Sequence, residues 1–171
     1  MPANESDPIV AFYSGGRDAA GRTLGEILAW DDDRLESVHD YIQWLFPTSR
    51  PSGVNPFAPL VTEGTVRAFS ADERLRARLR QALDRMLAFY GLMRRDARVE
   101  IDPARFPVRA RIWLHAGNHN HLRLTRIMDS VSALGLPDDA RALKRCLLED
   151  VCAGPGAGRV SARTVEFWRV T

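Results

Sequence analysis

The stretch that decides the expected fold is residues 35–47, LESVHDYIQWLFP. Placed at about 100° per residue, its apolar side chains form one helical stripe: Leu35, Val38, Ile42, Leu45 and Phe46. The aspartates at 31–33 favour a helix start, and Pro47 ends the helix because proline has no N–H to donate. We therefore predict one amphipathic helix over residues 33–46, with its stripe in a core.

Capping signals and apolar periodicity predict further helices along the chain. Thr23 and Glu26 have the spacing of a capping box, and Ser70 opens the clearest amphipathic helix, which Gly91 ends. Ser161 is expected to cap a terminal helix. The remaining predicted helices lie over residues 62–69, 109–114, 119–134 and 137–151.

Strand signals are nearly absent from the sequence. The alternation around Glu100 allows only a two-residue extended piece, because Pro103 and Pro107 prevent a long strand. Residues 47–60 are rich in proline and are expected to form an irregular loop. We expect an all-α fold, a single globular domain of about seven helices around one core. This domain would comprise residues 20–171 and follow an N-terminal arm of residues 1–19.

Length and composition fit one soluble domain. The 171 residues suffice to bury a core, and 45% hydrophobic content is ordinary for a globular protein. A formal net charge of +2 is too small to indicate nucleic-acid binding, which we do not expect. No apolar run approaches the roughly 20 residues of a membrane span, and the first residues lack the features of a signal peptide. We expect a cytoplasmic protein without a cofactor.

Polar side chains are arranged in ridges on two of the predicted helices. On the helix over residues 33–46, one edge of the apolar stripe carries Asp32, Glu36, His39 and Gln43. On the helix over residues 119–134, one face carries His119, Arg123, Arg126 and Ser130. Trp44 lies nearly opposite its stripe, so it is either covered by another element or exposed for binding. The two ridges have complementary charges.

Two interpretations fit these ridges. In the structural one, ion pairs between the ridges hold the two helices together. In the functional one, the ridges form a ligand site, since ionisable groups at the edge of a core are common at such sites. We predict ion pairs between the acids of the first ridge (Glu36 or Asp32) and the arginines of the second, with His39 hydrogen-bonded in the same cluster. The candidate ligand-binding residues are Glu36, His39, Gln43, Trp44, His119, Asn120, Arg123 and Arg126.

Metal binding and nucleophilic catalysis have weak support. Glu36 and His39 have the Glu-x-x-His spacing of di-metal helical bundles, but no second copy occurs. His115 and His119 have the spacing of a zinc-binding helix, but Ala116 stands where a metalloprotease has its general-base glutamate. No serine or cysteine has a recognisable base partner. We therefore expect no metal.

Three motifs make the chain resemble the conserved domain of the opioid growth factor receptor family. The family pattern is an aspartate-rich entry followed by Leu-Glu-x-x-His-x-Tyr-Ile-Gln-Trp-Leu-Phe-Pro, which matches residues 31–47. Its Met-Leu-x-Phe-Tyr-Gly segment matches residues 86–91, and its His-Asn-x-Leu-Arg-Ile-Thr-Arg-Ile segment matches residues 119–127 with Leu124 in place of isoleucine. Asn55 and residues 58–60 resemble the segment that follows the first motif. The resemblance implies a receptor-like role, because the animal receptor is described as binding an enkephalin peptide and acting in growth control. The chain resembles a stand-alone, bacterial member.

We therefore expect a non-enzymatic, receptor-like binding module with its site between the helices over 33–46 and 119–134. Its partner is expected to be a peptide, a small anionic ligand or a protein, and Trp44 or Trp113 would supply apolar surface. The alternative is an enzyme acting on a phosphate- or carboxylate-bearing substrate, with His39 or His119 as general base.

Overall fold

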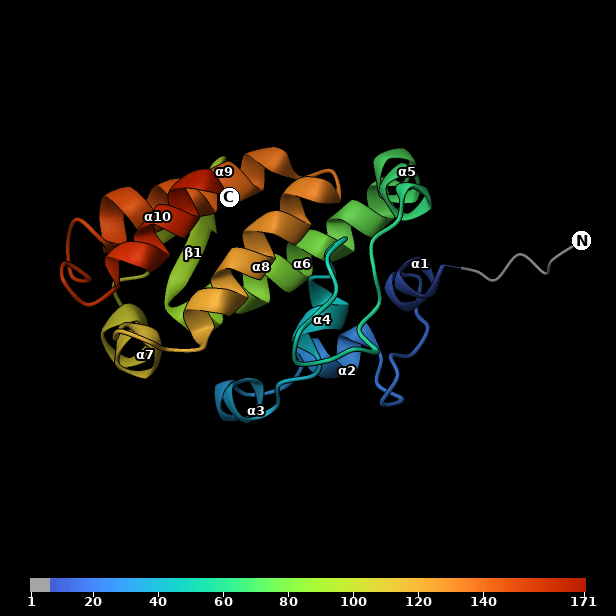
Figure 1. Cartoon of the computed structure of the whole chain (residues 1–171), viewed down its shortest axis with the longest axis horizontal. Coiled ribbons are helices and arrows are strands. Elements are labelled where there is room, and N and C mark those ends of the chain that lie inside the picture. Colours follow the sequence, from blue (N-terminus) through green and yellow to red (C-terminus); the bar gives the residue numbers. More distant parts are fainter. Residues whose placement is uncertain (1–6) are drawn as a thin grey trace, which may run out of the picture. The chain divides into compact units, whose positions relative to one another are not determined.

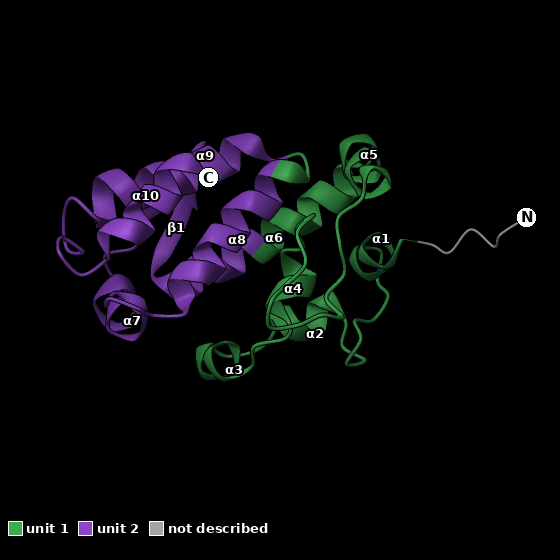
Figure 2. Cartoon of the chain, in the orientation of Figure 1, with its two compact units in different colours: residues 1–82, 133–135 green, residues 83–132, 136–171 purple. Residues whose placement is uncertain are grey.

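The computed structural model describes residues 7–171 (Figure 1), and these residues form two compact units (Figure 2). Unit 1 contains the described part of residues 1–82 together with residues 133–135. Unit 2 contains residues 83–132 and 136–171. Helix α6 (Glu73–Tyr90) begins in unit 1 and ends in unit 2.

The two units contain different elements. Unit 1 has the start of α6 and five short helices: α1 (Pro8–Tyr13), α2 (Leu24–Leu28), α3 (Asp32–Ser37), α4 (Ile42–Leu45) and α5 (Glu63–Ala71). Unit 2 has the end of α6, most of α8 (Asn120–Ala133), and β1 (Leu92–Arg95), β2 (Arg98–Ile101), α7 (Phe106–Trp113), α9 (Pro137–Arg145), the π-helical turn η1 (Cys146–Val151) and α10 (Ala162–Val170). None of the helices within residues 7–171 combines the length and apolar character that crossing a membrane requires.

The expectation of an all-α fold with about seven helices is wrong. Residues 7–171 contain ten α-helices, one π-helical turn, and an antiparallel hairpin made of β1 and β2. The strands pair in register from Leu92 opposite Ile101 to Arg95 opposite Arg98. The fold is mostly helical, with one small sheet in unit 2.

The hairpin forms because its strands fit between the residues that would interrupt them. Gly91 has a φ of +77° and turns the chain out of α6, so that β1 begins at the next residue. Asp96, with a φ of +53°, takes the left-handed conformation in the connection between the strands. Pro103 lies beyond the end of β2 and removes no hydrogen bond from the ladder. Leu92 and Val99 are buried, which gives the short strands an apolar side.

The single helix predicted over residues 33–46 is also wrong, because the chain leaves the helix between α3 and α4. Val38 has an extended backbone, with a φ of −93° and a ψ of 135°. Two contacts hold this break: the Tyr41 hydroxyl donates to a backbone carbonyl of α3 at 2.9 Å, and Arg22 donates to Asp40 at 2.9 Å. The first polar ridge therefore does not follow one continuous helix.

The core of unit 1 is aromatic. Phe12 and Tyr13 of α1 are fully buried. The Phe12 ring meets Trp44 edge to face at 5.6 Å, and Tyr13 meets Phe69 of α5 at 5.2 Å. The Tyr13 hydroxyl donates to a backbone carbonyl of α4 at 2.5 Å, and burial raises its pKa. Helix α1 lies in the predicted N-terminal arm, and the boundary between a separate arm and a following domain stays a prediction.

The core of unit 2 centres on Trp113, the fully buried last residue of α7. Its indole N–H donates to the carbonyl of Tyr90 at 3.0 Å, and the two rings meet edge to face at 5.5 Å. His121 of α8 contacts the rings of both Trp113 and Trp168, with centroid distances of 6.2 and 5.7 Å. The indole of Trp168 donates to the Thr125 hydroxyl at 3.1 Å, which fastens α10 to α8.

Candidate functional site

A pocket in unit 1 brings together three of the residues that the sequence singled out: His39, Gln43 and Trp44. Three segments line it, namely the turn before α2, the break between α3 and α4 with the start of α4, and the proline-rich loop after α4. Its volume is about 380 Å³. Ligand pockets commonly span roughly 300–1,000 Å³, so this one suits a small molecule or a single peptide side chain with its backbone.

One wall of the pocket contains an ion-pair network around Arg22. The guanidinium donates to Asp18 at 2.7 Å and to Asp40 at 2.9 Å, and it lies 5.4 Å from the centre of the Trp30 ring. Asp18 is buried and also accepts two backbone N–H bonds of its own turn. Burial alone would lower the pKa of Arg22, but its hydrogen bonds to Asp40 and Asp18 raise that pKa overall. The wall therefore offers a fixed pair of opposite charges, Arg22 and Asp40.

Gln43 contributes a buried amide to the pocket. The residue is only 4% exposed, and its Oε1 has no hydrogen-bond partner within residues 7–171. A buried acceptor without a donor costs about 1–3 kcal/mol. An N–H or O–H group that reached this oxygen would relieve the cost.

Part of the pocket lining is apolar. Trp44 is buried against Phe12, so it is covered by α1 and not presented as an exposed binding residue. Phe57, in contrast, is 86% exposed at the pocket's edge, and Val54 beside it is exposed as well. Asn55 accepts a hydrogen bond from the Phe57 N–H at 3.2 Å, which holds this part of the loop in a local turn.

The other candidate residues of the second ridge lie on or next to α8. Asn120 and Arg123 are buried, and the Oδ1 of Asn120 accepts hydrogen bonds from Tyr90 and from Arg123, each at 3.4 Å. His119 is exposed, whereas Arg126 is half-buried and burial lowers its pKa. Asn120 and Arg123 thus belong to a polar cluster inside unit 2.

The predicted meeting of the two ridges stays a prediction. Glu36 is half-buried on α3 and does not line the unit 1 pocket. The ion pairs expected between Glu36 or Asp32 and the arginines of α8 would join residues of different units. A site between the segments 33–46 and 119–134 likewise stays a prediction.

The spacings considered for metal binding are interrupted in the structure. Helix α3 ends before His39, so Glu36 and His39 do not share a helix. His115 lies before the left-handed Gly117 and pairs with the Asn118 side chain at 2.9 Å. Within residues 7–171 no three or more histidine, cysteine or acidic side chains are grouped so that they could hold a metal ion.

Several residues of the pocket were missed by sequence reasoning. Arg22 comes from the turn before α2, and Val54, Asn55 and Phe57 come from the proline-rich loop. The loop carried one usable signal, because Asn55 belongs to a segment that resembles the family pattern. No feature of the sequence indicated Arg22, because only folding brings it close to Asp40.

His121 was also missed, although its surroundings predict a pH-dependent stability. Its Nε2 lies 2.9 Å from the Trp113 carbonyl, and its Nδ1 is buried without a partner in the described part of the chain. Burial lowers the pKa of His121 below 6.5, with a further decrease from His115 and an opposing effect of the Trp113 hydrogen bond. The unfolded chain therefore takes up a proton that the folded protein resists. We expect stability to be level above about pH 7 and to fall by at most about 1.4 kcal/mol per pH unit below about 6.5.

Thermal unfolding followed by circular dichroism between about pH 7.5 and pH 5.5 checks this expectation. His121→Gln should lose part of the decrease in melting temperature that the unmodified chain shows over this range. His39→Gln is the matched control, because His39 is exposed and is not among the groups that shift the pKa of His121, and it should keep the full decrease. Identical pH profiles for the unmodified chain and His121→Gln would contradict the assignment.

The fold and the pocket define a mostly helical domain with one hairpin and a polar pocket bordered by an exposed aromatic side chain. The family described as "Opioid growth factor receptor (OGFr) conserved region" matches residues 19–171. The chain belongs to this family, which confirms the resemblance seen in the motifs.

Curated relatives of the chain include vertebrate proteins that are much longer. The opioid growth factor receptor of Mus musculus is 40% identical over 129 residues, which are 71% of this chain and 19% of the relative. The receptor of Rattus norvegicus is 39% identical over 76% of this chain and 23% of its own length. The opioid growth factor receptor-like protein 1 of Xenopus tropicalis is 32% identical over 88% of this chain and 30% of its own length. No solved structure matches the chain significantly.

Proposed function

We propose that the protein is a non-enzymatic, receptor-like binding module whose ligand occupies the unit 1 pocket. The observation that carries the proposal is the convergence of His39, Gln43 and Trp44 on one pocket beside the exposed Phe57. The names of the relatives, which describe receptors for an opioid growth factor, support a binding role. The cytoplasmic location expected from the sequence remains a prediction.

The chemistry of the pocket favours a short peptide segment over a small anion. Arg22 already pairs with two carboxylates, which leaves no excess positive charge for a phosphate or a lone carboxylate. A backbone N–H would satisfy the Oε1 of Gln43, and an apolar side chain would cover the exposed ring of Phe57. The paired charges of Arg22 and Asp40 suit the polar backbone of such a segment.

Selection of short peptides from a random library on the full chain, followed by calorimetry, tests the proposal. Phe57→Ala should weaken binding of the selected peptides about tenfold, because an aromatic anchor at the pocket edge is lost. The folded state should be unaffected, since Phe57 is 86% exposed. Phe167→Ala is the matched control, because Phe167 of α10 is also exposed, at 52%, and lies outside the pocket.

The possible outcomes separate binding from catalysis. Peptides that bind Phe57→Ala and the unmodified chain equally well, or a selection that enriches none, would overturn the proposal. Hydrolysis of a selected peptide that disappears in His39→Gln would replace it by the enzymatic alternative.

A further inference from the structure

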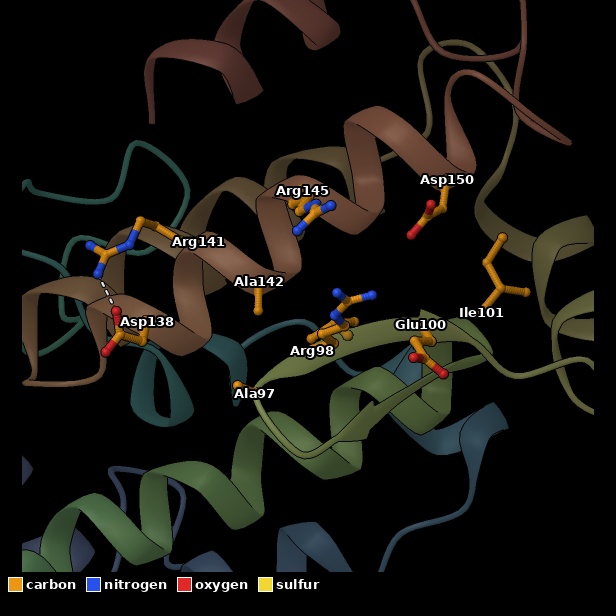
Figure 3. A pocket seen from close by; sticks show the side chains of 10 residues that line it. Ala97, Arg98, Glu100, Ile101, Asp138, Arg141, Ala142, Arg145 and Asp150 are labelled. Atoms are coloured by element: carbon orange, nitrogen blue, oxygen red, sulfur yellow. Dashed lines mark hydrogen bonds and ion pairs between the residues drawn. The ribbon is translucent and has the colours of Figure 1, made fainter.

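Unit 2 contains a second recess, the groove between β2 and the helical segment of α9 and η1 (Figure 3). Its volume is about 710 Å³. Its apolar lining includes Ile101 and Ala142, while its charged side chains come from both walls. These are Arg98, Glu100, Asp138, Arg141, Arg145 and Asp150.

The three arginines of the groove are held differently. Arg141 forms an ion pair with Asp138, and the Nε of Arg145 donates to Glu149 at 2.9 Å. Arg98 forms no ion pair or hydrogen bond with another side chain of residues 7–171, and it is exposed. Figure 3 shows the guanidinium groups of Arg98 and Arg145 entering the same space from opposite walls.

This juxtaposition defines a place for an anion. Two guanidinium groups that approach each other repel, and an anion between them turns the repulsion into attraction. Phosphate and carboxylate offer at least two oxygens, which match the planar fork of arginine. Arg98 and Arg145 come from different elements and can therefore contact such a group from two sides.

The other end of the groove is acidic. Figure 3 shows Asp150 and Glu100 beyond Arg98 and Arg145, toward Ile101. Asp150 makes no ion pair within the described residues, and its carboxylate accepts a hydrogen bond from the Cys146 thiol. Apart from Asp138, which pairs with Arg141 at the far end, the acidic side chains of the groove lie at one end and the arginines lie toward the other.

The wall that carries Asp150 has an unusual backbone. In η1 the N–H of Cys152 donates to the carbonyl of Leu147 at 2.9 Å, the i→i+5 bond of a π-turn. Single π-turns are rare in helices and frequent at functional sites. Burial, followed by the charge and hydrogen bond of Asp150, raises the pKa of Cys146 to about 12. This thiol is therefore protonated at neutral pH, and the groove is suited to binding and not to thiolate chemistry.

We propose that the groove binds a small zwitterion, with its phosphate or carboxylate group between Arg98 and Arg145 and its ammonium group near Asp150. The lining has as many carboxylates as arginines, so a polyanion such as nucleic acid would meet repulsion from Glu100 and Asp150. The groove shares no residue with the unit 1 pocket, so its zwitterionic ligand is distinct from the peptide proposed for that pocket.

Titration of the full chain followed by amide NMR tests the proposal with four probes. O-phosphoethanolamine and γ-aminobutyrate carry both charges, whereas ethyl phosphate and butyrate carry only the anion. We expect the zwitterions to shift the amides of β2, α9 and η1 and to bind more tightly than their anionic counterparts. The tighter of the two zwitterions identifies the anionic group as phosphate or carboxylate.

Variants test which end of the groove binds the anionic group and which end binds the ammonium group. Arg98→Gln should weaken binding of every probe about tenfold without lowering the melting temperature, because Arg98 is exposed. Asp150→Asn should weaken only the zwitterions. Arg111→Gln, which replaces an exposed arginine of α7 outside the groove, is the control and should bind as the unmodified chain does.

Three results would overturn the proposal. The first is the absence of shifts in the groove with all four probes at millimolar concentrations. The second is an equal loss of affinity in Arg98→Gln and Arg111→Gln, which would indicate non-specific attraction to surface arginines. The third is an equal loss of affinity for ethyl phosphate and O-phosphoethanolamine in Asp150→Asn. This result would show that Asp150 does not bind the ammonium group.

Discussion

Replacement of Gly91 by alanine is expected to lower the free energy of unfolding by roughly 3–5 kcal/mol, which combines backbone strain with overpacking. Gly91 has a φ of +77°, which an alanine adopts only with strain. A Cβ atom there would also lie 2.6 Å from the Cα and 2.9 Å from the N of Phe106, and backbone atoms cannot move aside as a side chain can. The Gly91 carbonyl accepts the N–H of Asp102 at 2.9 Å, so any shift disturbs the link between α6, the hairpin and α7. Urea denaturation followed by circular dichroism measures the change.

Gly117→Ala is the matched control for the strain alone. Gly117 has nearly the same φ, +76°, but a Cβ atom there would meet nothing within 4 Å. The free energy of unfolding of this variant should fall by only about 1–2 kcal/mol, the cost of the left-handed conformation. Similar losses for Gly91→Ala and Gly117→Ala would show that close packing against Phe106 contributes nothing.

Trp113→Ala is expected to destabilise the protein by about 3–5 kcal/mol, because a large buried ring leaves a cavity that the core cannot fill. Trp113 is fully buried, and its ring meets Tyr90, Phe106 and His121 edge to face. The variant also leaves the Tyr90 carbonyl without the indole N–H that it accepts at 3.0 Å. Chemical denaturation gives the change in stability, and near-ultraviolet circular dichroism reports the loss of aromatic packing.

Two variants separate the parts of this effect. Trp113→Phe retains an aromatic ring but loses the indole N–H, so it should be clearly less damaging than Trp113→Ala. Ile112→Ala changes the neighbouring residue, which is 38% exposed. It should lower the free energy of unfolding less than either Trp113 variant does. A loss for Ile112→Ala as large as that for Trp113→Ala would contradict the central position of Trp113 in the core.

The long amphipathic helices were predictable because their apolar stripes repeat over several turns. Helix α8 agrees with the helix predicted over residues 119–134, and α6 lies within the amphipathic helix predicted from Ser70 to Gly91. The break between α3 and α4 was not predictable from periodicity, because the stripe continues through Val38. The bonds that hold it, from Arg22 to Asp40 and from Tyr41 to α3, exist only in the folded chain.

The candidate site was predictable only where its residues lie close together in the sequence. The motif of residues 35–47, which is rich in polar and aromatic side chains, contains His39, Gln43 and Trp44. The structure places these three residues in one pocket. Arg22 and Phe57 lie outside this motif, and their positions depend on how the flanking turn and the proline-rich loop fold back. The sequence predicted only a two-residue extended piece in place of the hairpin. Strands of four residues show too little alternation of apolar and polar residues to be distinguished from a loop.

The π-turn of η1 lets its helix hold one residue more than regular α-helical bonding allows. A π-turn is equivalent to an α-helix with one inserted residue, which it takes up within a single turn. Loss of one residue between 146 and 149 would therefore restore regular helical bonding and leave the direction of the following residues unchanged. Loss of one residue from the regular part of α9 would instead rotate the residues on its two sides by about 100° relative to each other. In an alignment of this family, a one-residue gap at the π-turn would therefore mark members in which Arg145 and Asp150 still lie on the same wall of the groove.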